Sequence, residues 1–339
     1  MRTQFLALII SLLLQTSFFV PHSNASTADN PETLDFSLKD ITDIQFLKNN
    51  PNVKTLDISF NKIRDLSPLK TLTKLETLTI SGNPLKSLHP ISGLTKLKSL
   101  TAVSRNIYDI EALKDLVNLE TLILDASNIK TLAPLEKLVK LRILHLRDTN
   151  RLEDISALEN LSNLEELHLG GKKFKSIDAL KGLVNLRTLS IGGGQRLDLK
   201  PLAKLLNLND LTIHSRNPDL TPLGSLTGLH ALHMEHSKIT SISALATLIN
   251  IEDLYIGFNK ITDIAAIANM KDISTLRISA NKVKDLTPLR HLQFIQHLEI
   301  GNQAVIADDK HCPTGKNVPK LLNRYCTRYI KAAKDQNKG

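Results

Sequence analysis

Val53–Lys74 reads VKTLDISFNKIRDLSPLKTLTK, and the same pattern recurs along almost the whole chain. Leu75–Lys96 reads LETLTISGNPLKSLHPISGLTK, and Ile273–Phe294 reads ISTLRISANKVKDLTPLRHLQF. These segments share the pattern LxxLxIxxNxIxDLxPLxxLxx, a unit of 22 residues. Repeats of about 20 to 50 residues are typical of solenoids, because one unit buries its apolar side chains only against its neighbours.

The register of this repeat can be followed through twelve steps. Successive repeats open 22 residues apart, except for one spacing of 23 (Leu141 to Leu164) and one of 21 (Leu208 to Leu229). We number the positions of each repeat from its opening residue. The repeats open at Pro31, Val53, Leu75, Leu97, Leu119, Leu141, Leu164, Leu186, Leu208, Leu229, Ile251, Ile273 and Ile295, and the last one is incomplete.

The first half of each repeat predicts a short strand. In Thr55–Ser59 the apolar residues Leu56 and Ile58 alternate with polar ones, which is the period of a strand with one buried face. Asn61 follows at position 9, where its side chain is suited to hydrogen-bonding the backbone of the turn and of the next coil. Parallel pairing of successive strands then predicts one continuous sheet.

The second half of the repeat is predicted to return along the convex side. Apolar residues recur there at four positions, the first of which is Ile63 in this repeat. Ser67 and Pro68 have the pattern of a helix N-cap followed by proline at the first helical position. We therefore predict an α/β fold: a right-handed superhelical solenoid with a parallel concave sheet and short helical or 3-10 convex turns.

These motifs resemble those of a known family. The 22-residue period, with LxxLxI and DLSPL in each unit, is similar to the internalin-like class of bacterial leucine-rich repeat proteins. The resemblance covers residues 31–302 and is specific for fold rather than for function. It implies a curved solenoid whose concave sheet binds another protein. Internalins also carry a helical cap, an immunoglobulin-like domain and surface-attachment signals; only a minimal front cap is evident here, which argues against a role in host invasion.

Both ends of such a solenoid need caps that cover the last coil. At the front, residues 34–52 form a degenerate repeat in which we predict a longer helix over 42–48. At the back, apolar residues at helical spacing predict an amphipathic lid. They are Val318, Leu321, Leu322, Tyr325, Tyr329 and Ile330. We assign the repeats to 31–302, the C-terminal cap to 303–332 and a flexible tail to 333–339.

The two cysteines of the chain, Cys312 and Cys326, both lie in this C-terminal cap. In an exported protein an isolated pair is most simply one disulfide, which here would pin the lid. Two free thiols are the alternative. A metal site is disfavoured, because only His311 lies nearby and a structural zinc ion takes four ligands.

The N-terminus has the features of a secretory signal peptide. Arg2 gives a positive charge, residues 5–20 are mostly apolar, and Ser23-Asn24-Ala25 fits a cleavage site. We predict a signal peptide over 1–25, a mature N-terminal segment over 26–30 and a secreted or periplasmic protein. The stretch is short for a membrane span, so no stable insertion is expected after cleavage; an uncleaved anchor is the alternative.

Composition agrees with a repeat protein. The 339 residues are 42% hydrophobic but only 4% aromatic, without tryptophan, so leucine and isoleucine must make up most of the core. The formal net charge is +9, yet the basic residues are scattered and no run of five occurs. We interpret this charge as favouring solubility, and we expect no nucleic-acid partner.

Positions 3, 5, 7 and 8 of each repeat are predicted to face the concave side. They are small and polar in the first repeats, whereas the middle repeats carry histidines and charged residues there, beside a floor of glycines at 170–171 and 192–193. The middle repeats also lack the asparagine at position 9, and local rules are often broken where function requires it. We predict a protein-binding patch; mere tolerance of exposed positions to polar residues is the alternative. The patch comprises His145, Arg147, Glu166, His168, His214, His233, Glu235, His236, Tyr255 and Arg277.

Metal binding and catalysis are not predicted. His145 and His168 occupy the same position of adjacent strands, about 5 Å apart and within reach of one ion, but no third ligand is evident from the sequence. No phosphate-binding loop, GxSxG or HExxH motif occurs. Carboxylate–histidine pairs such as Glu166 and His168 would lie on an open sheet, without the desolvation that tunes catalytic groups. We expect no cofactor.

The sequence therefore predicts an exported, monomeric binding module that is not an enzyme and whose partner is a protein of unknown identity. Two alternatives remain. One is a structural or envelope-associated protein that binds glycan or an anionic surface through its lysines. The other, less favoured, is a metal-binding or small-ligand-binding protein.

Overall fold

The computed structural model describes residues 31–125, 128–148, 151–171, 173–192, 196–301 and 303–336. The chain from Pro31 onward forms one compact unit, and all that follows concerns this unit. The predicted signal peptide over 1–25 and the segment over 26–30 lie outside the described residues. Within the described part, no helix is long and apolar enough to cross a membrane.

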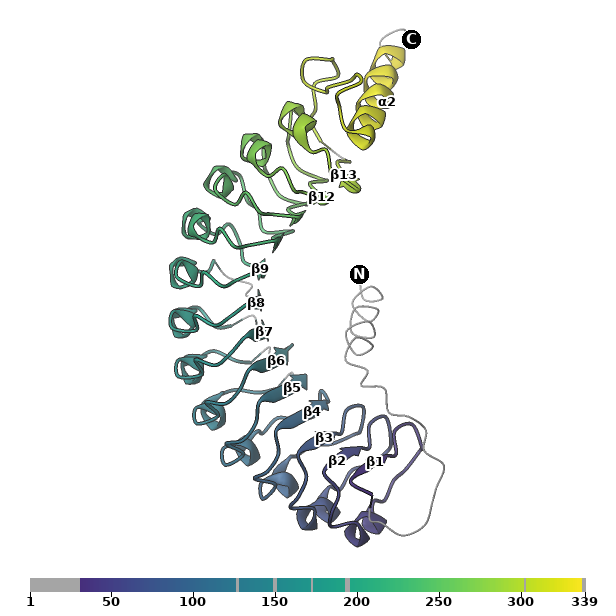
Figure 1. Cartoon of the computed structure of the whole chain (residues 1–339), viewed down its shortest axis with the longest axis vertical. Coiled ribbons are helices and arrows are strands. Elements are labelled where there is room, and N and C mark those ends of the chain that lie inside the picture. The colour runs from purple at the N-terminus through teal and green to yellow at the C-terminus, as the bar shows by residue number, and fades with distance from the viewer. Residues whose placement is uncertain are drawn as a thin grey trace. The chain divides into compact units, whose positions relative to one another are not determined.

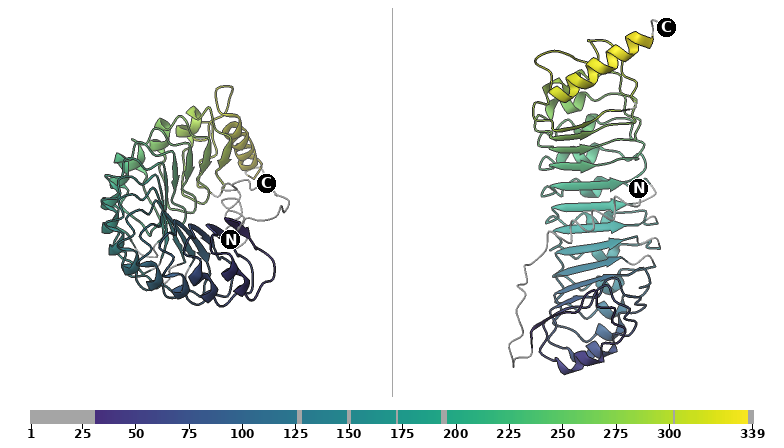
Figure 2. Two further views of the ribbon diagram at one scale, coloured as in Figure 1. Left: turned by 60° about the horizontal axis from the view of Figure 1, so that its bottom comes forward. Right: turned by 90° about the vertical axis from the view of Figure 1, so that its right-hand side faces the viewer.

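One parallel sheet runs through the described residues, with its thirteen strands in chain order and each strand paired with the next. Figure 2 shows the strands side by side along the length of the unit. The strands are β1 (Thr33–Asp35), β2 (Thr55–Asp57), β3 (Thr77–Thr79), β4 (Ser99–Val103), β5 (Thr121–Asp125), β6 (Ile143–Arg147), β7 (Glu166–Gly170), β8 (Thr188–Gly192), β9 (Asp210–His214), β10 (Ala231–His233), β11 (Asp253–Tyr255), β12 (Thr275–Arg277) and β13 (His297–Glu299).

Short 3-10 helices form the opposite, convex side, and the sheet lines the concave side of the arc that the repeats follow (Figure 1). The predicted fold class is thus confirmed. The 3-10 helices are η1 (Gln45–Asn49), η2 (Ser67–Thr71), η3 (His89–Ile91), η4 (Glu111–Leu113), η5 (Ala133–Leu135), η6 (Ser156–Leu158), η7 (Asp178–Leu180), η8 (Lys200–Leu202), η9 (Thr221–Ser225), η10 (Ser243–Leu245), η11 (Ala265–Asn269) and η12 (Thr287–His291).

The core is a column of leucine and isoleucine side chains between the sheet and the 3-10 helices. Leu56 and Ile58 from β2 and the following turn are fully buried, as is Ile63 on the returning half. Their equivalents in the neighbouring repeats pack directly above and below them in one continuous cluster. Because no coil encloses its own leucines, each coil is held in place by its neighbours.

Asparagines at position 9 connect neighbouring coils through the backbone. Asn83 is 4% exposed and donates from its Nδ2 to the carbonyl oxygens of Ile80, in its own coil, and of Ile58, in the preceding coil. Its Oδ1 accepts the backbone N–H of Ile63 at 3.0 Å. The sequence predicts bonds to the next coil, but the bonds run to the preceding one. The physical role is the predicted one, since backbone groups that are buried between coils receive partners.

Each 3-10 helix begins with a side-chain hydrogen bond. Ser67 is predicted from the sequence to cap the convex turn, but it is the first residue of η2, and the preceding Leu66 makes no side-chain capping bond. Asp65 Oδ1 instead accepts the backbone N–H of Ser67 at 2.8 Å. An aspartate, serine or threonine makes the equivalent bond at all twelve 3-10 helices of the described residues. The aspartate of the DLSPL motif is therefore the residue that starts the turn.

The two ends differ from the sequence prediction in the lengths of their helices. At the front, the predicted longer helix over 42–48 is only the 3-10 helix η1, Gln45–Asn49. At the back, the helix α2 runs from Lys320 to Gln336, so the predicted tail over 333–339 is helical through Gln336. Leu322 and Ile330 of α2 are buried, in agreement with an amphipathic lid.

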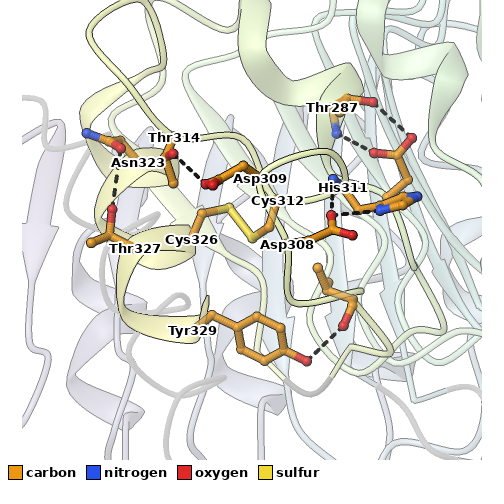
Figure 3. The surroundings of a disulfide bond; sticks show 12 residues. Thr287, Asp308, Asp309, His311, Cys312, Thr314, Asn323, Cys326, Thr327 and Tyr329 are labelled. Carbon is orange, nitrogen blue, oxygen red and sulfur yellow. Dashed lines mark hydrogen bonds and ion pairs between the residues drawn. A yellow bond between two sulfur atoms is a disulfide. The ribbon is translucent and has the colours of Figure 1, made fainter. Parts of the chain in front are cut away.

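A disulfide between Cys312 and Cys326 ties α2 to the loop that precedes it, and the alternative of two free thiols is wrong. Figure 3 shows this bond together with the hydrogen bond from the Tyr329 hydroxyl to the carbonyl oxygen of Val305, 2.9 Å long. Asn323 Oδ1 also accepts the backbone N–H of Gly315. The lid is thus fixed to the loop before it at several points along α2.

The strands are longest in the middle of the sheet. The strands β4 to β9 have five residues, whereas all the others have three. All six long strands belong to repeats that lack asparagine at position 9, and β2, β3, β11 and β12 belong to repeats that have it; the short strands β1, β10 and β13 lack it too. The irregular middle of the repeat pattern is therefore the broad part of the concave sheet.

We predict that Asn83→Leu destabilises the solenoid strongly. The variant leaves buried backbone groups of two coils without partners, which costs about 3 kcal/mol in free energy of unfolding. Asn185→Leu is the matched control, because Asn185 is exposed and donates a single bond, to the carbonyl oxygen of Ser162; its loss should stay below about 1 kcal/mol. Urea unfolding followed by circular dichroism measures both, and equal losses would contradict a role for the asparagine ladder.

Candidate functional site

One row of side chains at position 5 crosses the broad part of the concave sheet. Because the strands pair in parallel and in register, the position 5 residues of successive repeats lie directly beside one another. From β6 to β13 this row reads His145, His168, Ser190, Thr212, His233, Tyr255, Arg277 and Glu299. The predicted patch residues at position 5 are therefore brought together on one face.

His145, Glu166 and His168 form a compact group across β6 and β7, which we call the His–Glu–His cluster. The two imidazole rings stack with their centroids 4.2 Å apart and their planes 27° from parallel. Glu166 precedes His168 by two residues on the same face of β7. Its Oε1 lies 2.7 Å from Nε2 of His145 and 3.0 Å from Nε2 of His168.

The His–Glu–His cluster is largely buried although it lies on a sheet surface. His145 is only 8% exposed, and both His168 and Glu166 are partly buried. The hydrogen bonds from His145 and His168 hold the pKa of the Glu166 carboxyl far below its usual range, against the opposing effect of its burial. Glu166 is therefore an anion held between two imidazole nitrogens.

A second group, the stacked row, consists of His233, Tyr255 and Arg277 on β10 to β12. The His233 ring lies 4.2 Å from the Tyr255 ring and 9° from parallel to it. The Arg277 guanidinium lies 4.9 Å from the centre of the Tyr255 ring, within the range of a cation–π contact. The Arg277 Nε is 3.1 Å from the Glu299 carboxylate, which fixes the far end of the row.

Two aspartates at position 3 flank the stacked row. Asp210 on β9 and Asp253 on β11 are register partners of Ala231 on the strand between them. Burial lowers the pKa of the His233 imidazole and raises the pKa of the Asp210 carboxyl, and the attraction between the two groups opposes both shifts. Asp210 is absent from the predicted patch although it lies beside it.

The remaining residues of the predicted patch surround these two groups. His236 stacks on Phe258 at position 8, with ring centroids 4.4 Å apart. His214 lies beside Gly192, which lies beside Gly170, so glycines form the predicted floor next to an imidazole. The Glu235 side chain extends over Gly257. Arg147 ends β6, but its side chain, like Gly193, lies outside the described residues.

The contacts within the patch could not be read from the repeat pattern. The sequence places His145 beside His168 but does not identify Glu166 as a third donor atom at the same point. A signal was present, because residues two apart on a strand share a face and the repeat register gives the neighbour across the sheet. Likewise, the register makes His233 and Tyr255 neighbours, but it does not show that their rings stack.

Comparisons with known proteins agree with the repeat fold. A family model described as Leucine Rich repeats (2 copies) matches residues 32–71 and 117–160. A search of curated protein sequences finds no significant match. Among solved structures, an internalin (inlF) from Listeria monocytogenes is 25% identical, with 89% of each chain covered and a TM-score of 0.76.

Two further solved structures share the fold at lower identity. A leucine-rich repeat protein from Leptospira interrogans is 21% identical over 78% of this chain and 70% of that one, with a TM-score of 0.65. The plant peptide hormone receptor RGFR1, solved in complex with RGF2, is 15% identical over 76% of this chain and 53% of that one, with a TM-score of 0.50.

The fold and these comparisons define the class of protein. The chain is a leucine-rich repeat protein, with a single parallel sheet and 3-10 convex turns. Its repeats are of the internalin-like bacterial type, so the resemblance drawn from the sequence is confirmed.

We predict that Tyr255 ionises above the ordinary tyrosine pKa of about 10. Burial raises the pKa of its phenol, the nearby Asp253 carboxylate raises it further, and Arg277 opposes both. The phenolate absorbance lost in Tyr255→Phe relative to the parent chain isolates this step. Asp253→Asn removes a negative charge and should lower the pKa. A step at or below the ordinary value, with the fold intact by circular dichroism, would contradict the packing described here.

Proposed function

We propose that the chain is an exported, non-enzymatic module that binds a protein partner through the concave sheet, with the stacked row and the His–Glu–His cluster as its contact groups. The observation that carries this proposal is the alignment of large polar and aromatic side chains in one row. They are held by strand register and by one another, on a face that the convex 3-10 helices do not cover.

The stacked row has the properties of a binding hot spot. Tyrosine and arginine are enriched among residues that dominate interface energies. Tyr255 is packed between His233 and Arg277, and Arg277 is also paired with Glu299, so these side chains are ordered before any partner binds. Preordering reduces the entropy lost on association, and so a larger part of the contact energy appears as affinity.

The chemistry of the concave face favours binding over catalysis. The most strongly perturbed carboxyl, Glu166, is held in its ionised form by two hydrogen bonds. Such a carboxylate is a weak base and a poor proton donor near neutral pH, whereas a general acid or base works best with a pKa near the working pH. A fixed anion between two imidazoles is well suited to recognising a partner of complementary charge.

One protein of the same fold has been solved in a complex. The plant receptor RGFR1, which shares the fold, was solved in complex with RGF2. Taken with the row of side chains on the concave face, this supports the proposal that the repeats of this chain also present a surface for a protein ligand.

We predict that the double variant Tyr255→Ala/Arg277→Ala loses partner binding. The parent chain, immobilised, should capture a defined protein from envelope or culture-medium fractions, and the double variant should bind that protein at least about tenfold more weakly, because a hot-spot truncation costs 2 kcal/mol or more by rough estimate. Surface plasmon resonance with the captured protein measures both affinities.

Tyr108→Ala/Arg290→Ala is the matched control, since it removes the same two residue types from exposed positions outside the concave row. It should bind like the parent chain. Equal binding by both double variants would refute the concave proposal. Capture that weakens steeply with salt, together with binding to polyanions, would instead favour an envelope-associated protein that attaches through its lysines.

We also predict export with cleavage after Ala25. Expression of the full chain in a bacterial host should yield a mature protein that begins at Ser26, since the apolar stretch and the Ser23-Asn24-Ala25 site direct processing. Intact mass and N-terminal sequencing of the periplasmic and medium fractions measure this. A chain that retains Met1 and stays with the membrane would support the uncleaved anchor.

A further inference from the structure

We propose that the His–Glu–His cluster is a binding site for a divalent transition-metal ion of the zinc type, held by Nε2 of His145, Nε2 of His168 and the Glu166 carboxylate. The same cluster is among the contact groups of the proposed function, but all three ligands come from this chain, so an ion can be bound and tested without a partner. It differs from the expectation drawn from the sequence, where no third ligand was evident.

The geometry supplies three donor atoms that converge on one point. Their mutual separations are all within 4.8 Å, and the two that involve the carboxylate are 2.7 and 3.0 Å. Donor atoms around a tetrahedral zinc ion, with bonds of about 2.0 to 2.1 Å, lie roughly 3.3 Å apart. The two carboxylate separations would need to widen by roughly 0.3 to 0.6 Å to reach this value, and the imidazole donors already lie within 4.8 Å of each other.

The donor set selects among metals. Two imidazole nitrogens and one carboxylate oxygen suit zinc and its borderline neighbours, whereas calcium and magnesium prefer oxygen ligands throughout. Two histidines and one glutamate leave at least one coordination position open, which faces the concave surface, where water completes the shell. Within the described residues, no other histidine, cysteine, aspartate or glutamate donors gather into a group of three that could hold an ion.

The surroundings of the cluster favour retention of an ion. The register partners of His145 and Glu166 on the side toward β5 are Ile123 and Ile143, whose apolar side chains share the same face of the sheet. Low polarity on that side strengthens the attraction between the ion and the Glu166 anion. Because both histidines lie on paired strands of the rigid sheet, little ordering is needed before the ion binds.

Metal binding replaces the two contacts between the imidazoles and the Glu166 carboxylate. In the structure, each Nε2 lies within hydrogen-bonding distance of Glu166 Oε1. An ion takes the Nε2 lone pair, so in the bound state each neutral imidazole carries its proton on Nδ1. The ion's positive charge then takes the place of the two N–H groups as the partner of the carboxylate.

The test uses the mature, tag-free chain and zinc chloride, measured by isothermal titration calorimetry and by equilibrium dialysis with metal analysis. We expect one zinc ion per chain and no uptake of calcium under the same conditions. Glu166→Gln keeps the shape and the hydrogen-bonding capacity of the side chain but removes its charge. Since loss of a partner outside the ligand shell already weakens metal binding by about 10- to 100-fold, this variant and His168→Ala should each weaken zinc binding by at least tenfold.

Two control variants separate this site from adventitious binding. His89→Ala removes an exposed imidazole of η3 on the convex side, and His311→Ala removes the histidine that pairs with Asp308 near the disulfide, 2.8 Å apart. Both should bind zinc like the parent chain. If His168→Ala fails to fold by circular dichroism, Glu166→Gln decides alone. No zinc uptake by the parent chain, or undiminished uptake by Glu166→Gln, would overturn the proposal whether or not a protein partner is found.

Discussion

The whole structure depends on the burial of leucines that no single coil can enclose. A 22-residue coil contributes one strand and one short 3-10 helix, too few elements to form a core of its own. Its inward leucines become fully buried only when another coil stacks on each side. The fixed period makes each coil superimpose on the next, and position 5 of one strand then lies beside position 5 of its neighbour. Strand register, and with it the concave row, is a consequence of that stacking.

Much of the fold follows from this constraint and could be predicted from the sequence. The openings of the thirteen repeats place every strand, and the alternation in Thr55–Ser59 fixes which side faces inward. Local chemistry was harder to predict. Asp65 rather than Ser67 starts the turn, because a 3-10 helix of a few residues needs its first N–H bonded from outside, and the aspartate two residues earlier reaches it. The ends differ most, since the caps are not bound by the period and their helix lengths are set by local packing.

The candidate site shows a similar division. The repeat period alone predicts that His145, His168 and His233 lie on one face, and the structure agrees. The repeat period does not predict the orientation of each side chain. Whether Glu166 points to solvent or between two imidazoles depends on rotamers and on the apolar neighbours that close one side. The strength of the group therefore comes from contacts that pattern analysis does not see, and these contacts suggest a metal-ion site as well as a protein-binding surface.

The loss of the position 9 asparagine in the middle repeats links the repeat pattern to the candidate site. Where Asn83 and its equivalents join neighbouring coils, the strands stop at position 5. In β4 to β9, where asparagine is replaced, the strands reach position 7 and the concave sheet is broader, although β10, with Ser237 at position 9, is short as well. The His–Glu–His cluster lies within this broader part. A local departure from the repeat pattern thus coincides with the part of the surface that has the richest chemistry.

The central claim is that stacking places these side chains in one ordered row. A crystal structure of the protein, at a resolution that shows side-chain orientation, tests this most directly. The account predicts stacked imidazoles of His145 and His168 with the Glu166 carboxylate between their Nε2 atoms, and His233 stacked on Tyr255. Histidines on different faces of the solenoid, or Glu166 turned away into solvent, would contradict it.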